Sequence, residues 1–391
     1  MSGGVTSEPL HVFIVAGEES GDQLGSGLMR ALNERLDGAV RFSGVGGEAM
    51  ATRGLASLFP LGDVALMGFV AVARRLPLVL ARIRQTTRAI VTAHPNILVI
   101  VDSPDFTHRV ARRVRAAAPQ IPIVDYVSPS VWAWRPGRAR AMRAYVDHVL
   151  ALLPFEPAVH ARLGGPPCTY VGHPLATRAD ELRPDEKEMQ RRNADPPVLL
   201  VLPGSRRSEV RRLLDPFGAA LAILRSRVGA LEIIVPTVPH VAGEVTEAAT
   251  KWNVVPRIVV HRDEKLAAFR IARAALAASG TVTLELALAG VPMVAAYRVA
   301  ALEAAIARRV IKVPSVILAN LVLGEKIVPE FLQESCTADR LAAALAPLLD
   351  ETPERRRQTQ AFARLDEIMQ VGSALPDQRA ADIVLALARK R

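Results

Sequence analysis

Cysteine and aromatic residues are scarce in this sequence. Its 391 residues include two cysteines, Cys168 and Cys336, which give neither a disulfide framework nor the spacing of a metal site. Aromatic residues make up 4% of the chain, and few alternate with basic residues, which disfavours a platform for stacking nucleic-acid bases. The sequence also lacks an Asp-x-Asp pair. It therefore offers no dedicated carboxylate clamp, and we expect no bound metal ion.

Long apolar runs are absent as well. No stretch approaches the roughly 18–20 apolar residues that a membrane-spanning helix needs. Residues 1–9 are small and polar, without the basic and apolar regions of a secretory signal. Negative charge is in deficit, because 49 Lys and Arg outnumber 39 Asp and Glu, a net charge of +10. We expect a cytoplasmic protein with anionic partners. A dedicated nucleic-acid binder is disfavoured, because the arginines are scattered along helical stretches.

Short apolar runs alternate with helical patterns along the whole chain. They are typical of buried parallel strands and lie at 11–16, 97–101, 121–127, 148–153, 198–202, 231–235, 257–260, 274–278 and 293–297. This alternation predicts an α/β fold with two Rossmann-like, doubly wound domains facing across a cleft, followed by C-terminal helices. We place the first domain at 1–175, a Pro- and Gly-rich linker at 176–195 and the second domain at 196–360. A C-terminal helix at 361–391 is expected to pack back on the first domain.

One stretch combines a buried strand, a turn of small residues and a helix start. The alanine-rich run at 271–278 predicts the strand, Ser279-Gly280-Thr281 the turn, and 281–289 the helix. Such a turn gathers unpaired N–H groups and a positive dipole end, which suits a phosphate or diphosphate. Glu285, one helical turn in, could accept hydrogen bonds from an attached ribose. An ordinary strand–helix turn with a surface Glu is the alternative.

A second turn of this kind follows the strand at 198–202. Pro203-Gly204-Ser205-Arg206 offers backbone donors and a guanidinium at a helix start, again suited to phosphate. Two such turns in one half of the chain strengthen the prediction of a diphosphate site there. By contrast, residues 44–49 (GVGGEA) match a variant of the dinucleotide fingerprint. They follow a second strand predicted at 40–43, whereas the fingerprint normally follows the first, and no acidic strand end lies at the expected distance. We therefore expect no cofactor.

Asp102 follows directly after the apolar run at 97–101. In open α/β sheets the carboxyl ends of the strands line the ligand crevice, so this carboxylate is a candidate general base. Asp at a strand end is also a common helix cap, and the residues alone leave both roles open. Residues 128–135 contain two of the three tryptophans; this loop could form a sugar platform or a lid, or pack into its own domain.

The stretch 64–91 joins a ten-residue apolar run, 64–73, to a cluster of arginines. An apolar segment beside basic residues, too short to span, suits contact with lipid headgroups. A core helix with solvated arginines is the equal alternative. The candidate membrane-contact residues are Val64, Leu66, Met67, Phe69, Val70, Arg74, Arg75 and Arg82.

Taken together, the motifs resemble those of the lipid-A-disaccharide synthases, inverting glycosyltransferases of the GT-B, family 19 type. The resemblance covers nearly the whole chain and is carried by 16–22 (AGEESGD), 66–68 (LMG), 102–106 (DSPDF), 126–134 (YVSPSVWAW), 152–156 (LLPFE), 172–174 (GHP), 202–206 (LPGSR), 278–285 (ASGTVTLE) and 332–333 (LQ). It implies transfer of 2,3-diacylglucosamine from its UDP conjugate to 2,3-diacylglucosamine 1-phosphate. The products are a β(1→6) disaccharide and UDP, and the enzyme acts as a peripheral protein on the cytoplasmic face of the inner membrane.

The resemblance also assigns residue roles. Asp102 corresponds to the catalytic carboxylate, and Arg206 to a contact of the donor diphosphate. The donor cradle is assigned to Ser279, Gly280, Thr281 and Glu285, with Asn320 in the donor region; Ala319 precedes it where many relatives carry Pro, so this loop could differ. Further contacts to the acceptor or its loops are suggested for Ser20, Asp22, Asp105, Ser128 and Trp132.

Two rival functions are weighed against this one. A UDP-N-acetylglucosamine 2-epimerase would share the fold and the UDP cradle, but it needs no acyl chains and leaves the stretch 64–88 unexplained. A non-catalytic protein that binds anionic lipid would suit the charge and that stretch. It leaves Asp102 and the two phosphate-suited turns without a purpose.

Overall fold

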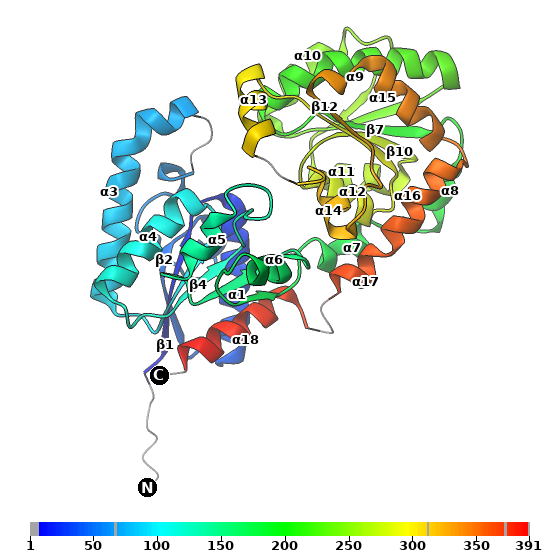
Figure 1. Ribbon diagram of the computed structural model, residues 1–391. Helices are drawn as coiled ribbons and strands as arrows, with labels where there is room; N and C mark the ends of the chain where they lie inside the picture. Colours follow the sequence, from blue (N-terminus) through cyan, green and yellow to red (C-terminus); the bar gives the residue numbers. More distant parts are fainter. Residues whose placement is uncertain (1–7, 66–68, 311–312, 371–373, 390–391) are drawn as a thin grey trace. The chain divides into compact units, whose positions relative to one another are not determined.

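The computed structural model describes residues 8–65, 69–310, 313–370 and 374–389. The chain forms two compact units, Met1–His173 with Val371–Arg391, and Pro174–Gln370. Each unit is built on a six-stranded parallel sheet with helices packed against it (Figure 1). The predicted pair of Rossmann-like domains is thereby confirmed.

The sheet of the first unit has the strand order β2-β1-β3-β4-β5-β6. Its strands are short and apolar, as expected for strands buried between helices: β1 (Leu10–Ala16), β2 (Val40–Val45), β3 (Ile97–Val101), β4 (Ile123–Tyr126), β5 (His148–Ala151) and β6 (Cys168–Tyr170). The helices of this unit are α1 (Glu19–Arg35), α2 (Glu48–Ala51), η1 (Leu61–Asp63), α3 (Phe69–Ala93), α4 (Pro104–Ala117), α5 (Gly137–Met142), α6 (Glu156–Arg162) and α18 (Pro376–Ala388).

The second sheet has the order β12-β11-β10-β7-β8-β9. Its strands are β7 (Val198–Leu202), β8 (Glu232–Pro236), β9 (Arg257–Val259), β10 (Ala274–Ala278), β11 (Met293–Tyr297) and β12 (Glu330–Leu332). Its helices are η2 (Ala176–Arg178), α7 (Ala179–Leu182), α8 (Glu186–Asn193), α9 (Arg207–Val228), α10 (Pro239–Ala249), α11 (Arg262–Ile271), α12 (Val282–Leu288), α13 (Ala301–Val310), α14 (Leu318–Leu323), η3 (Gln333–Ser335), α15 (Ala338–Leu345), η4 (Ala346–Leu348), α16 (Pro353–Ala363) and α17 (Leu365–Met369).

Strand order fixes where each unit can bind a ligand. In the first sheet the chain reverses its direction of winding between β1 and β3, and in the second between β7 and β10. Loops that leave the carboxyl ends of two such strands run apart over opposite faces, which opens a crevice between them. The four candidate loops of the sequence, those after β1, β3, β7 and β10, are the loops at these two points.

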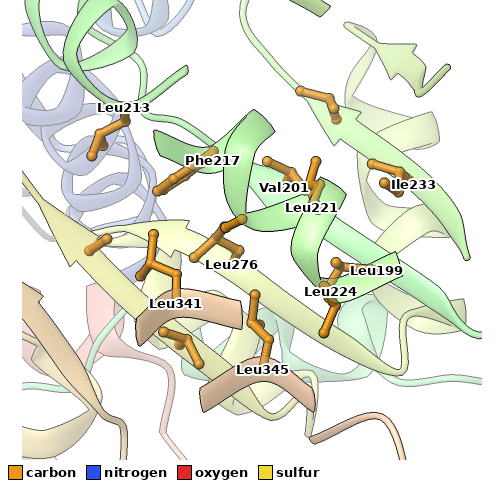
Figure 2. Packing of buried hydrophobic residues seen from close by; sticks show 14 of the residues in the cluster. Leu199, Val201, Leu213, Phe217, Leu221, Leu224, Ile233, Leu276, Leu341 and Leu345 are labelled. Carbon is orange, nitrogen blue, oxygen red and sulfur yellow. The ribbon is translucent and has the colours of Figure 1, made fainter. Parts of the chain in front are cut away.

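The core of the second unit lies between its sheet and the pair α9 and α15. Phe217, Leu221 and Leu224 of α9 pack over Leu199 and Val201 of β7 (Figure 2). Leu276, Leu341 and Leu345 complete this layer from β10 and α15 (Figure 2). All are fully buried, and such side chains contribute roughly 1.5–3 kcal/mol each when removed from water.

The last helix, α18, belongs to the first unit. It packs along α1 (Figure 1), and its Ala380, Ala381 and Val384 are buried in the core that also holds Leu28 and Leu32. Arg35 adds a two-bond ion pair with Asp382, at 2.8 and 3.0 Å, and Arg30 pairs with Asp377. Exposed pairs of this kind stabilise little, so apolar burial holds the helix in place.

The segment 176–195, suggested as a linker, lies in the second unit as η2, α7 and α8. The buried guanidinium of Arg192 donates to the carbonyl oxygens of Phe269, Arg270 and Ala289 at 3.0–3.2 Å. These bonds tie α8 to α11 and to the end of α12. The C-terminal stretch, expected as one helix from 361 to 391, is divided among the end of α16, α17 and α18.

Candidate active site

A cavity of about 310 Å³ opens at the carboxyl ends of β7 and β10. Its wall combines the turn after β7 with the turn after β10, the two stretches that the sequence indicated for phosphate. The lining residues are Leu202, Gly204, Ser205, Arg206, Glu209, Pro236, Thr237, Val238, Lys265, Ala278, Ser279, Gly280, Thr281, Val282 and Glu285. Thus Arg206, the Ser279–Thr281 turn and Glu285 line one cavity, as expected for a single diphosphate and ribose site.

Within the turn after β10, the hydrogen-bond donors are unevenly distributed. The N–H of Ser279 donates to the carbonyl of Ala296 at 3.1 Å, and its hydroxyl donates to the carbonyl of Val316 at 2.9 Å. A hydroxyl has one hydrogen, so Ser279 has no donor left for a ligand. The N–H groups of Gly280, Thr281 and Val282 make no hydrogen bond in the part of the chain that the structure describes. These three amides are the donors available to an anion.

Arg206 is held at the rim of the cavity by a buried carboxylate. Its guanidinium donates to Oε1 of Glu209 at 2.9 Å, and the hydroxyl of Tyr297 donates to the same oxygen at 3.1 Å. Glu209 is 7% exposed, whereas the side chain of Arg206 is 58% exposed. Burial, followed by the nearby Glu209 carboxylate, raises the pKa of Tyr297 above its ordinary value. An exposed guanidinium at the rim of the cavity is well placed to bind a phosphate oxygen.

The carboxylate of Glu285 is paired inside the same cavity. The ammonium Nζ of Lys265, on α11, lies 2.6 Å from its Oε2. Lys265 belongs to no motif that the sequence singled out, and neither does Glu209. Both lie on helices whose amphipathic pattern gives no reason to separate one charged residue from its neighbours, so only the folded structure identifies them as cavity residues.

Asn320 is placed differently from expectation. It is 2% exposed and does not line the cavity. Its amide nitrogen donates to Val328 O and Glu330 Oε1, both at 3.0 Å, and its oxygen accepts from the N–H groups of Ile327 and Val328. Glu330 also accepts the N–H of Val316. Asn320 therefore helps to hold the segment that presents the Val316 carbonyl to Ser279. In this geometry its side chain does not face the cavity proposed for the UDP-sugar.

In the first unit, Asp102 ends β3 in an unusual backbone conformation. Asp102 and Ser103 have φ values of +53° and +44°, a left-handed region that non-glycine residues rarely occupy and that costs energy at each position. The carboxylate accepts the Ser103 N–H at 2.7 Å and the Ser20 hydroxyl at 3.1 Å. Thr107 donates to the Asp102 carbonyl at 2.6 Å. The strained turn is thus held by bonds on both sides.

Gly17, which directly follows β1, makes room for this turn. A Cβ at Gly17 would lie 2.4 Å from the Cβ of Ser103, far inside any normal contact. The glycine of the AGEESGD motif is therefore required by the close approach of Ser103. Because Ser103 is bonded to Asp102, a larger residue at 17 would also shift the candidate base.

A smaller cavity of about 190 Å³ lies beside the Asp102 turn, between α3 and α4. Val64, Leu76, Val79 and Phe106 supply an apolar wall, and Glu18, Ser103, Pro104, Asp105 and Arg109 line the rest. Of the suggested acceptor contacts, Asp105 is therefore close to the candidate base, and Ser20 touches it.

The remaining suggested contacts have partners inside the first unit. Asp22 is 3% exposed and accepts the N–H groups of Gly47, Ala49 and Met50 at 2.7–3.1 Å. Its carboxylate thus occupies the start of α2, where the fingerprint-like GVGGEA stretch would have bound a dinucleotide. This supports the expectation that no such cofactor binds there.

Ser128 and Trp132 are likewise engaged within the fold. The Ser128 hydroxyl is buried and lies 2.8 Å from Nε2 of His160. The indole of Trp132 donates to Glu156 at 3.1 Å and packs edge-on against Phe155. Burial raises the pKa of Glu156 to about 7. The tryptophan-rich loop is therefore packed into its own domain at Trp132, which was one of the two readings of the sequence.

The suggested membrane-contact residues differ in their exposure to solvent, and several lie outside the described residues. Leu66 and Met67 lie outside the described residues, as do the side chains of Phe69, Val70 and Arg74. Val64 is 6% exposed in the core, and Arg82 binds Asp63 at 2.7 Å and stacks over Phe59. These two side chains serve the fold, whereas Arg75 is exposed. Leu76 and Leu78, which the sequence did not single out, are 43% and 36% exposed.

The described residues contain neither a membrane-spanning helix nor a metal-binding cluster. None of their helices is long and apolar enough to cross a membrane. No group of three or more His, Cys, Asp or Glu side chains in the described ranges is arranged to hold a metal ion.

Sequence comparisons link the chain to one family. The family model described as lipid-A-disaccharide synthetase matches residues 12–384. The chain is 61% identical to the lipid-A-disaccharide synthase of Nitrobacter hamburgensis, over 98% of this chain and 97% of that protein. It is 48% identical to the synthase of Rhodospirillum centenum, over 98% of this chain and 96% of that protein.

Solved structures with a similar fold are more distant in sequence. The UDP-GlcNAc 2-epimerase of Neisseria meningitidis bound to UDP-GlcNAc aligns with a TM-score of 0.63, at 11% identity, over 98% of this chain and 100% of that one. MurG of Acinetobacter baumannii aligns with a TM-score of 0.58, at 15% identity, over 97% and 100%. At such identities the likeness shows the two-domain fold alone.

Proposed function

This chain belongs to the lipid-A-disaccharide synthase family, and on that premise we propose how its residues share the work of the reaction. The enzyme is a glycosyltransferase that joins UDP-2,3-diacylglucosamine to 2,3-diacylglucosamine 1-phosphate, forming the lipid A disaccharide 1-phosphate and UDP. The observation that carries this function is the family match over residues 12–384. An inverting transfer needs a base for the acceptor hydroxyl, stabilisation of the leaving diphosphate, and in-line placement.

The donor's UDP is assigned to the cavity at the ends of β7 and β10. The free N–H groups of Gly280, Thr281 and Val282 and the guanidinium of Arg206 suit a diphosphate. Glu285 suits the ribose, because a carboxylate accepts hydrogen bonds from hydroxyl groups. Ser279 and Asn320 are assigned supporting roles, since their own donors are used within the protein. The arrangement stabilises negative charge where the leaving group develops it.

Asp102 is assigned the role of general base toward the 6′-hydroxyl of the acceptor. Its carboxylate is oriented by Ser20 and Ser103, and the small cavity beside it combines apolar and charged groups, as an acylated sugar phosphate requires. Removing the hydroxyl proton as the bond to the anomeric carbon forms raises the nucleophilicity of the oxygen, and UDP departs from the opposite face.

The 2-epimerase alternative shares the fold and a UDP site. The structural neighbours that carry this activity are 11–14% identical to the chain, too low to assign the activity to this chain, whereas the synthases are 44–61% identical to it. Binding of UDP, measured by calorimetry on the full chain, tests the donor assignment. Micromolar to millimolar affinity is expected, the range in which enzyme substrates bind; no heat of binding would contradict the assignment of the cavity and favour a protein that binds only lipid.

Peripheral attachment to an anionic membrane is assigned to exposed residues of α3. The helix carries two exposed apolar side chains, Leu76 and Leu78, and three exposed arginines, Arg75, Arg84 and Arg88. Apolar residues enter the headgroup layer and arginines attract anionic lipid, about 1 kcal/mol for each basic residue near the surface. The partner is expected to be the cytoplasmic face of the inner membrane.

Leu76→Glu combined with Leu78→Glu should lower cosedimentation with phosphatidylglycerol vesicles about tenfold, because two apolar contacts are lost and two negative charges added. Leu375→Glu is the matched control, since Leu375 is equally exposed, at 43%, but lies outside α3. Equal binding by all three proteins would contradict the role of α3.

A further inference from the structure

Lys265 lies in the wall of the donor cavity, and nothing above gives it a function. Its ammonium is 2.6 Å from Oε2 of Glu285, which lies on a different helix, α12. The same ammonium lies over the ring of Phe269, one turn further along α11, at 5.2 Å from the ring centroid. A cation held by a carboxylate and an aromatic face at once has little freedom to rotate. The two contacts therefore fix the position of the charge.

This pairing also fixes the carboxylate of Glu285. Its Oε2 is bound to Lys265, whereas Oε1 accepts no hydrogen bond from the residues that the structure describes. The side chain of Glu285 is 19% exposed and that of Lys265 33%, so both are sheltered but not sealed from the cavity. Hydrogen bonds to a carboxylate are roughly twice as strong as those between neutral groups. Glu285 is thus oriented by Lys265 and left with one oxygen for a ligand.

We propose that Lys265 is a positioning residue for ribose recognition. By holding Oε2, it aims Oε1 of Glu285 at the hydroxyl groups of the donor's ribose. The inference rests on the proposed function in one respect, that Glu285 contacts the ribose. In this role Lys265 acts through Glu285 and does not contact the diphosphate. Replacing Lys265 should therefore weaken the binding of uridine and of UDP by the same factor.

Discrimination between ribose and deoxyribose separates this role from a merely structural one. A site built to bind a hydroxyl rejects an analogue that lacks it, because its own polar group is left unpaired. We expect the wild-type chain to bind UDP at least about tenfold more tightly than one of its 2′-deoxy and 3′-deoxy analogues. In Lys265→Met this preference should fall to about twofold or less, and Lys265→Arg, which keeps the cation, should retain most of it.

Calorimetry on the full chain measures the dissociation constants of UDP, uridine and the two deoxy analogues. The proteins compared are wild type, Lys265→Met, Lys265→Arg, Glu285→Gln and the double variant Lys265→Met with Glu285→Gln. The loss of preference for ribose over deoxyribose should be no larger in the double variant than in the single variants. Both single changes weaken the same hydrogen bond, the one between Glu285 and the ribose, so their effects should not add. Lys251→Met is the matched control, since Lys251 is exposed at the end of α10, and its preference should equal that of wild type. If Lys265→Met does not fold, Lys265→Gln replaces it in the same comparison.

The outcomes separate the inference from the function on which it rests. If wild type does not bind UDP, the proposed donor site is wrong. If wild type prefers ribose and Glu285→Gln loses the preference while Lys265→Met keeps it, only the inference about Lys265 is overturned. A loss in Lys265→Met that is larger for UDP than for uridine also overturns it, because Lys265 would then contact the phosphates.

Discussion

Asp102→Asn is expected to lower kcat by about 10²–10⁴-fold, the contribution of a well-placed general base. Asparagine is nearly isosteric: its Oδ1 can still accept the Ser103 N–H, and its Nδ2 can donate to the hydroxyl oxygen of Ser20, so the turn at the end of β3 should persist. It cannot take up the proton of the acceptor hydroxyl. The affinity for UDP should be unchanged, because the donor cavity lies in the second unit. Single-turnover rates and UDP calorimetry measure the two quantities separately.

Asp37→Asn is the matched control for this variant. Asp37 is exposed in the first unit, and its φ of +47° is a conformation that asparagine tolerates as well. The control should therefore keep wild-type activity and stability. A near-normal rate for Asp102→Asn would remove Asp102 from the mechanism. A collapse in both variants would point to loss of folding.

Arg206→Met should lower kcat by about 10²–10³-fold, the range found when one group that stabilises developing negative charge is removed. The guanidinium, anchored by Glu209, is expected to bind the diphosphate more strongly as UDP departs. UDP affinity should fall, whereas uridine, which has no phosphate, should bind as to wild type. This pattern is the opposite of the one expected for Lys265→Met. Steady-state kinetics and calorimetry with the two ligands distinguish them.

Arg207→Met is the control for the loss of one positive charge at the start of α9. The side chain of Arg207 is 62% exposed and pairs with Glu244 of α10, and Arg207 does not line the cavity. Exposed pairs contribute little, so kcat and UDP affinity should stay within about twofold of wild type. If Arg206→Met behaved as Arg207→Met does, the leaving-group role would be contradicted.

The architecture was predictable because it rests on local pattern. Each apolar run became a strand, with bounds that agree or differ by a few residues: 198–202 matches Val198–Leu202, and 257–260 compares with Arg257–Val259. Parallel sheets bury both faces of a strand, so their strands are continuous apolar runs that periodicity detects. The stretch 361–391, predicted as one helix, is divided among the end of α16, α17 and α18, because an amphipathic pattern does not show where one helix ends and the next begins.

The sequence predicted the parts of the site that are formed by backbone turns. It did not predict the side chains whose role depends on partners far away in the sequence. The turns after β7 and β10 were recognisable from glycine, small residues and an arginine, and the structure brings them to one cavity. Asn320 was expected to contact the donor because the family resemblance places it in the donor region, but its side-chain amide is hydrogen-bonded to residues 327–330. Lys265 had no motif at all. Which polar groups are already satisfied is a property of the folded chain.

An assay of the reaction tests the synthase activity most directly. The purified protein is mixed in detergent with UDP-2,3-diacylglucosamine and 2,3-diacylglucosamine 1-phosphate, with EDTA present, and UDP and the disaccharide are followed together. Both products should form in equal amounts, and EDTA should not slow their formation. UDP without disaccharide would indicate hydrolysis or another acceptor. No product, with or without added magnesium, would contradict the assignment of this chain as a lipid-A-disaccharide synthase.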